Sequence, residues 1–229
     1  MKGSILAFKL LKELDKKGIK AYLIGGSSRD YLLNKDFLDI DICSTSLPKV
    51  NMEALSDYEV INKDGLYYGV VKYFIDFKEV EIATLRKEYE YIKNRRPSKI
   101  EFIDNLEVDS LRRDFTINAI YIDYLGNVID YHNGLNDLKN KTITMIGNPE
   151  KRIEEDCLRI LRAIRLSDKL NFKLDDNLKE VILKKSYLVY SLNNNTLKKE
   201  INKFLEFRSI DYIKELLKSY KIELEQVYG

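Results

Sequence analysis

The hydrophobic pattern of the chain changes at residues 147–149 (Gly-Asn-Pro), and this change limits the folds that are open to it. Before that point, short apolar runs alternate with polar and turn-forming residues, which is typical of strands. After it, apolar residues recur at helical spacing in segments rich in Glu, Lys and Arg, without a strand signal. The sequence therefore predicts an α+β domain over residues 1–147, with a mixed sheet and flanking helices, followed by an all-α region over residues 148–229.

Individual elements follow from the spacing of the apolar residues. In the first part we expect a helix over residues 4–17 and a hairpin turn at Gly126 and Asn127. The expected strands are residues 21–24, 37–43, 67–74, 80–85, 119–123 and 128–129. The helices expected in the second part span about 150–170, 176–190, 196–207 and 209–219.

Composition favours a folded protein and argues against several kinds of site. Of the 229 residues, 45% are hydrophobic and 33% are charged, and 39 Lys and Arg nearly balance 37 Asp and Glu. The only Cys and His residues are Cys43, Cys157 and His132, too few for a Cys/His zinc cluster, so we expect any metal to be bound by oxygen. No apolar run approaches the roughly 18 residues of a membrane span, and the N-terminal segment lacks a signal-peptide pattern. We therefore expect a soluble, cytoplasmic protein.

The first candidate site is the junction between a predicted strand and a predicted helix at residues 25–30 (Gly-Gly-Ser-Ser-Arg-Asp). Bare backbone N–H groups, the positive end of the helix and the Arg29 guanidinium would meet there, which suits a triphosphate. The alternative is an ordinary tight strand-to-helix turn.

Two acids follow at strand spacing. Asp39 and Asp41 lie two residues apart in a predicted strand, so both side chains leave the same face and suit a Mg²⁺ ion whose coordination is completed by substrate phosphates. Glu81, on the predicted strand 80–85, is a candidate third carboxylate or a base that activates the attacking hydroxyl. The alternatives are solvated acids on an edge strand and, at Glu81, an outward-facing strand acid.

A third candidate site lies in the helical part. Asp156 and Arg159 are three residues apart, so on one helix they share a face and present an acceptor beside a fork of donors. Such a pair can meet the Watson–Crick edge of cytosine or, after a small rotation, that of adenine. The alternative is a solvated ion pair within the helix.

Together these motifs resemble those of the class II tRNA nucleotidyltransferase and bacterial poly(A) polymerase family. Residues 25–30 and the pair Asp39 and Asp41 are similar to its GGxVRD and DxD signature. The other similar blocks are residues 112–119 (RRDFTINA) for the block that reads the ribose, 130–138 for the hinge, 155–159 (EDCLR) for EDxxR, and, more weakly, 198–201 for the block that braces the neck. The resemblance covers about residues 5–205 and implies a polymerase-β-like nucleotidyltransferase head over 1–147 and a helical neck over 148–229.

The resemblance also implies an activity and a role for each matching residue. The activity is the Mg²⁺-dependent addition of C, C and A from CTP and ATP to the 3′ end of tRNA, with Asp39 and Asp41 as the catalytic, metal-holding acids. Asp156 and Arg159 are implied to select the base. The nucleotide-binding residues implied in all are Gly25, Gly26, Ser27, Arg29, Arg113, Asp114, Asp156, Arg159, Arg162 and Arg165.

Residues 86–97 resemble the flexible loop that CCA-adding members of the family need for the final adenosine. Lys93 stands where the family usually has Asp, Ser28 where it usually has Val, and Ser44 where it usually has Thr. The alternative is an ordinary charged surface loop.

Other functions remain open at this stage. One is a poly(A) polymerase or another transferase that acts on RNA 3′ ends; another is a non-catalytic RNA-binding head, which the retention of both acids argues against. Family members continue beyond the neck, so the chain is expected to be a piece of a longer protein, a minimal enzyme, or a head that needs a partner chain. The oligomeric state does not follow from the sequence.

Overall fold

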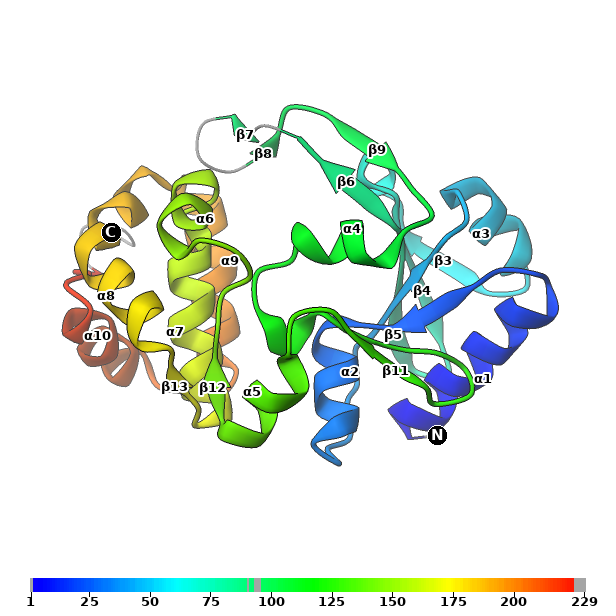
Figure 1. The fold of residues 1–229 in the computed structure, drawn as a ribbon, viewed down its shortest axis with the longest axis horizontal. Coiled ribbons are helices and arrows are strands. Elements are labelled where there is room, and N and C mark those ends of the chain that lie inside the picture. Colours follow the sequence, from blue (N-terminus) through cyan, green and yellow to red (C-terminus); the bar gives the residue numbers. More distant parts are fainter. Residues whose placement is uncertain (1, 90, 93–95, 225–229) are drawn as a thin grey trace. The chain divides into compact units, whose positions relative to one another are not determined.

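The structure, a computed structural model, describes residues 2–89, 91–92 and 96–224. The chain forms two compact units (Figure 1). The first unit comprises Met1–Tyr89 and Lys99–Leu138, and the second comprises Glu90–Ser98 and Lys139–Gly229. The functional boundary at residues 147 and 148 stays a prediction.

A seven-stranded mixed sheet forms the centre of the first unit. Its order is β11-β10-β1-β2-β5-β4-β3, in which β2 and β5 are parallel and the other neighbours are antiparallel. The strands are β1 (Ala21–Leu23), β2 (Ile40–Ser44), β3 (Glu59–Asn62), β4 (Val70–Ile75), β5 (Lys78–Thr84), β10 (Ile120–Ile122) and β11 (Val128–Asp130). This confirms the predicted α+β class with a mixed sheet.

Helices and a short ribbon surround the sheet. The helices are α1 (Gly3–Lys16), α2 (Gly25–Leu32), α3 (Pro48–Ala54), α4 (Leu106–Leu111) and α5 (Gly134–Asn140), with 3-10 turns η1 (Leu66–Tyr68) and η2 (Thr116–Asn118). Strands β6 (Arg86–Glu88) and β9 (Ile100–Phe102) pair as an antiparallel ribbon. Helix α1 lies against β1 and β2 (Figure 1), and its leucines at helical spacing are buried in the same apolar cluster as Ile40 and Ile42.

Two predicted strands start later than the alternation suggests. Strand β2 begins at Ile40, so Asp39 lies in the bend that precedes it rather than inside the strand. Strand β4 begins at Val70, because residues 66–68 form η1 and Gly69 adopts a positive φ of 76°. A Cβ atom at Gly69 would meet the Phe102 ring at 2.6 Å, so this turn needs glycine for both conformation and space. The predicted turn at Gly126 and Asn127 joins β10 to β11, as expected.

The second unit is helical with small additions. Its elements are α6 (Pro149–Glu155), α7 (Leu158–Leu170), α8 (Asp176–Lys185), η3 (Ser186–Ser191), α9 (Asn194–Leu205) and α10 (Ile210–Ser219), with the strands β7 (Tyr91–Ile92), β8 (Arg96–Pro97), β12 (Thr142–Ile143) and β13 (Lys173–Leu174). Strand β13 was not expected in an all-α region; Asn171 ends α7 in the left-handed conformation, and the chain then pairs with β12. Among the described residues, no helix combines the length and apolar character needed to cross a membrane.

Candidate active site

Strand β2 carries Asp41 to the start of helix α2. Ile40 and Ile42 point into the core, and the alternation of the strand turns Asp41 to the opposite face. Helix α2 begins at Gly25, whose φ is +70°, and a Cβ atom there would lie 3.0 Å from the Asp41 Oδ2 atom. The Gly26 N–H donates a hydrogen bond to the Asp41 carboxylate. The two glycines therefore allow an acid to approach a helix N-terminus closely, as the positive end of the helix dipole favours.

Ser27 ties the acidic segment to this helix. Its hydroxyl donates to the Asp39 carbonyl at 2.9 Å and accepts the Asp41 N–H at 2.8 Å. The side chain is 1% exposed. The Ser27 hydroxyl thus fixes the backbone on which both acids stand, and nucleotide binding by Ser27 stays a prediction.

The negative charge of Asp41 is only partly compensated by its surroundings. Burial, and then the negative charge of Glu81, raise the pKa of Asp41 to about 6, and Asp39 adds to this effect. The Gly26 N–H and the positive charge of Arg113 act in the opposite direction. A site where carboxylates repel one another is one where a divalent cation gains affinity, so the donor set fits a hard cation such as Mg²⁺.

Glu81 stands directly opposite Asp41 on the parallel strand β5. Its carboxylate also lies 3.7 Å from the Lys72 ammonium on β4, and its side chain is 37% exposed. Within the described ranges, no group of three or more Asp, Glu, His or Cys side chains is arranged to hold a metal ion. Asp39 and Asp41 therefore remain the candidate metal ligands. Glu81 is supported as a third carboxylate by its position opposite Asp41 in the pairing of β2 with β5.

Arg29 lies at the same helix start. Its side chain pairs with Asp30 at 2.8 Å, and its Nη1 atom donates to Asn118 Oδ1 at 2.8 Å. The distance from an ideal Cβ atom at Gly26 to Arg29 Nη2 is 3.5 Å. A guanidinium, a helix N-terminus and the Asp41 carboxylate thus lie close together, and the binding of a triphosphate there stays a prediction.

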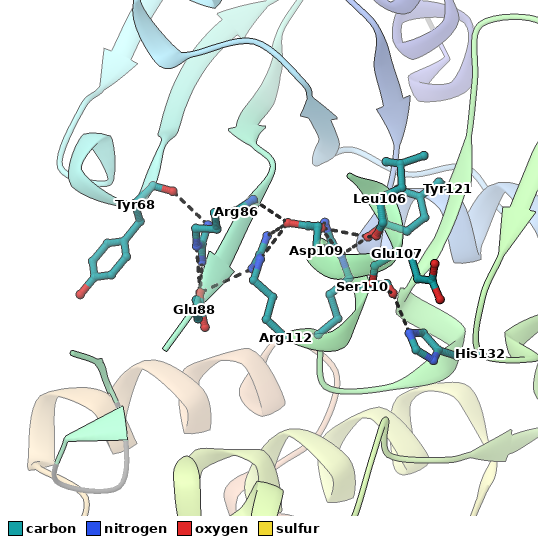
Figure 2. A network of polar contacts seen from close by, with 11 residues as sticks. Tyr68, Arg86, Glu88, Leu106, Glu107, Asp109, Ser110, Arg112, Tyr121 and His132 are labelled. Atoms are coloured by element: carbon teal, nitrogen blue, oxygen red, sulfur yellow. Dashed lines mark hydrogen bonds and ion pairs between the residues drawn. The ribbon is translucent and has the colours of Figure 1, made fainter. Parts of the chain in front are cut away.

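A buried polar network of this unit is centred on Asp109, which the sequence analysis missed. Figure 2 shows Asp109 of α4 between Arg112, Tyr121 and the backbone of Arg86. Arg113 adds two further hydrogen bonds to Oδ2, from Nε at 3.0 Å and Nη2 at 2.9 Å. Asp109 is fully buried, and although burial raises its pKa, Arg113 and Arg112 hold that pKa well below the ordinary range. The spacing Asp-x-x-Arg-Arg, which here runs from α4 past its C-terminus, was the signal that could have found it.

A second acid extends the network in Figure 2. Glu88 of β6 accepts a hydrogen bond from Arg86 Nε at 2.8 Å and lies 3.7 Å from Arg112 Nη1. Arg86 in turn donates to the Tyr68 carbonyl at 3.0 Å. Positive and negative side chains therefore alternate from Arg86 through Glu88 and Arg112 to Asp109, and they join the β6–β9 ribbon to helix α4.

This network changes the interpretation of Arg113. The resemblance implies that Arg113 contacts a ribose, but its guanidinium is bound to Asp109 and lies 3.2 Å from the Tyr121 hydroxyl. Burial acts to lower the pKa of Arg113, but Asp109, together with smaller effects of Tyr121 and Cys43, raises it above the ordinary range. The structure thus gives Arg113 a buried structural role, and its contact with a ribose stays a prediction. Asp114 follows, partly buried, just before η2.

In the second unit the premise for Asp156 and Arg159 is wrong, because they do not share a helix. Helix α6 ends at Glu155, and Asp156 is extended, with φ −148° and ψ 99°. Its Oδ1 atom accepts the Leu158 N–H at 3.1 Å and so caps the start of α7. The predicted helix over residues 150–170 is therefore two helices with a break at Asp156.

Arg159 is the largest fully buried side chain of the described chain. Its Nη1 atom donates to the Arg152 carbonyl at 2.5 Å and lies 3.3 Å from Glu155, and its Nη2 atom donates to the Tyr91 hydroxyl at 3.3 Å. The Tyr91 ring lies 5.4 Å from the guanidinium carbon. Residues of the predicted loop thus contact the predicted base reader; Lys93 of that loop lies outside the described residues.

The remaining arginines lie on helix α7. Arg165 Nε donates to Glu200 Oε1 of α9 at 2.6 Å, and the Glu200 side chain is 4% exposed. Arg162 is partly buried one turn earlier on the same helix. Glu200 belongs to the segment expected to brace the neck, and this ion pair joins α7 to α9.

The mixed sheet, with an acid of its central strand set against a glycine-initiated helix, defines a nucleotidyltransferase head fold. The chain belongs to the family described as the poly A polymerase head domain, whose profile matches residues 21–144.

Known proteins similar to this chain carry consistent names. A CCA-adding enzyme of Bacillus licheniformis is 38% identical over 200 residues, which are 87% of this chain and 50% of that protein. The crystal structure of the Bacillus stearothermophilus CCA-adding enzyme in complex with CTP has a TM-score of 0.76 at 30% identity and covers 87% of this chain and 47% of its own. A tRNA nucleotidyltransferase complexed with a primer tRNA and an incoming ATP analog has a TM-score of 0.74 at 30% identity, covering 95% of this chain and 62% of its own. The chain spans about half the length of the curated relatives it matches.

Proposed function

We propose that the chain carries the catalytic head of a Mg²⁺-dependent tRNA nucleotidyltransferase that adds C, C and A to the tRNA 3′ end from CTP and ATP. One observation carries the proposal: a buried carboxylate, Asp41, that lacks a side-chain ion pair among the described contacts lies against a glycine-initiated helix N-terminus beside Arg29. A structural acid would be paired with a cation, whereas this arrangement suits a metal ion and the phosphates of a nucleotide. The names of the relatives supply the substrate class.

Each residue has a part in the proposed reaction. Asp39 and Asp41 hold Mg²⁺, which when bound neutralises charge on the phosphates and favours attack by a hydroxyl. The N–H groups at the start of α2 and the Arg29 guanidinium orient the triphosphate for in-line displacement. Ser27 keeps both acids at the helix start, since its hydroxyl bonds the backbone of each.

Base selection is proposed for the second unit. Asp156, in the break between α6 and α7, and Arg159, on α7, are proposed to supply an acceptor and donors to the base, rather than one shared helix face. Arg113 and Asp114 are proposed near the ribose, and Arg162 and Arg165 beside the base reader. A role in tRNA processing would place the chain in the cytoplasm.

The test is nucleotide addition to a tRNA that lacks its CCA end. The wild-type chain, an Asp39→Ala/Asp41→Ala variant and an Asp57→Ala control, which removes an exposed acid, are incubated with Mg²⁺ and labelled CTP or ATP. Growth by three nucleotides, lost only in the double variant, is the expected result. A ladder of adenosines would replace the proposal with a poly(A) polymerase, and binding of RNA without any addition would reduce it to a non-catalytic head.

A further inference from the structure

One row of side chains crosses the sheet from a candidate metal ligand toward the sheet edge. Asp41 of β2 stands opposite Glu81 of β5, and Glu81 stands opposite Lys72 of β4, the strand that lies beside β5 (Figure 1). Because residues paired across neighbouring strands point to the same face, these three side chains share one face of the sheet. A cation therefore lies on the far side of Glu81 from the acid that is proposed to hold Mg²⁺.

The Lys72 ammonium contacts two acids of β5. It lies 3.7 Å from Glu81 Oε2 and 3.5 Å from Glu79 Oε2. Both distances exceed the usual range of an N–H···O hydrogen bond, and the Lys72 side chain is 41% exposed. The contact between Lys72 and Glu81 can therefore open without leaving a buried hydrogen bond unmade.

Glu81 is also the charged side chain with the strongest effect on Asp41. Of the charged side chains that shift the pKa of Asp41, Glu81 has the largest effect, ahead of Asp39. Yet in the part of the chain that the structure describes, these acids do not form a group of three that could hold a metal ion. Glu81 thus stands between two positive partners, the Lys72 ammonium on one side and a cation bound at Asp41 on the other.

We propose that Lys72 is a positioning residue that competes with the divalent cation for Glu81. While Lys72 is paired with Glu81, only the two Asp residues hold the ion; when the pair opens, Glu81 adds its negative charge to the site. The Lys72 ammonium keeps Glu79 as a partner in either state, so opening costs little. The inference rests on the proposed function, because that function supplies the cation.

Titration of the chain with Mn²⁺, in which electron paramagnetic resonance measures the free ion, tests this role without turnover. Lys72→Met removes the cation, and Lys72→Arg keeps it. Lys49→Met is the matched control, because Lys49 lies 3.9 Å from Glu53 on α3 and its side chain is 87% exposed. The Asp39→Ala/Asp41→Ala variant shows how much of the Mn²⁺ is bound at the candidate site, and thermal melts without metal detect any loss of folding.

We expect Lys72→Met to tighten Mn²⁺ binding about 3- to 10-fold, with Lys72→Arg no tighter than wild type and Lys49→Met unchanged. In a Glu81→Gln background, Lys72→Met should change the affinity less than about 2-fold, because the acid for which Lys72 competes is gone. Unchanged or weaker binding by Lys72→Met, or an equal gain in the Glu81→Gln background, would overturn the inference and leave the proposed function standing. A wild-type chain that binds no Mn²⁺, or whose Mn²⁺ binding survives the double Asp variant, would overturn the proposed metal ligands and the inference with them.

Discussion

Replacing Asp109 with Asn tests whether the network of Figure 2 holds the first unit together. Asp109 is fully buried and accepts hydrogen bonds from Arg112, Arg113, Tyr121 and the Arg86 backbone. Asparagine keeps the shape but removes the negative charge that Arg112 and Arg113 share, and of the two only Arg112 has a second carboxylate, Glu88, at 3.7 Å among the ion pairs described. Removing one partner of a buried ion pair costs about 3 to 5 kcal/mol, so we expect the free energy of unfolding to fall by that amount.

Urea denaturation measures the effect, with an Asp104→Asn variant as the control because Asp104 is exposed. The midpoint should fall for Asp109→Asn at unchanged slope and stay constant for the control. A loss below about 1 kcal/mol would refute the reasoning, because it would mean that the arginines find other partners or water at little cost.

The same carboxylate predicts a dependence on acid. Because the folded-state pKa of Asp109 is lowered, the unfolded chain takes up the proton first as pH falls below about 4. The stability that Asp109 contributes is therefore complete above that pH and is lost progressively below it. The Asp109→Asn variant should lack this part of the acid sensitivity, which urea midpoints between pH 3 and 6 would reveal; an unchanged slope would contradict the assignment.

Two further variants test single groups. Tyr73→Phe should raise the free energy of unfolding by up to about 1 kcal/mol, because the buried Tyr73 hydroxyl has no hydrogen-bond partner in the described structure. A thermal melt measures this change, and a loss of stability of more than about 1 kcal/mol would contradict the prediction. Asp41→Asn should stabilise the chain by up to about 3 kcal/mol at pH 8 in the presence of a chelator, because a carboxyl whose pKa is raised to about 6 is ionised there at a cost to the folded state. The same variant should lose nucleotide addition, and melting temperatures equal to those of the wild type would argue against this cost.

The sequence by itself determined the class of fold and the face of the strand from which Asp41 leaves, whereas Asp39 lies in the bend before that strand. Strand alternation placed Ile40 and Ile42 inward and Asp41 outward, and the adjacent glycines marked the start of α2. These are local properties, because the direction of a side chain in a strand and the conformation of a glycine depend on near neighbours. For the same reason the hairpin at Gly126 and the change to helices were predictable.

Only the tertiary structure decided what each charged side chain contacts. Arg113 is paired with Asp109, although the motif implied a ribose contact. The break at Asp156 was hidden because the spacing of apolar residues continues across it. Glu200 joins Arg165 from 35 positions away along the chain. Charges pair with whichever partner the packing of distant elements brings within a few ångströms, and this proximity leaves no periodic signal in the sequence.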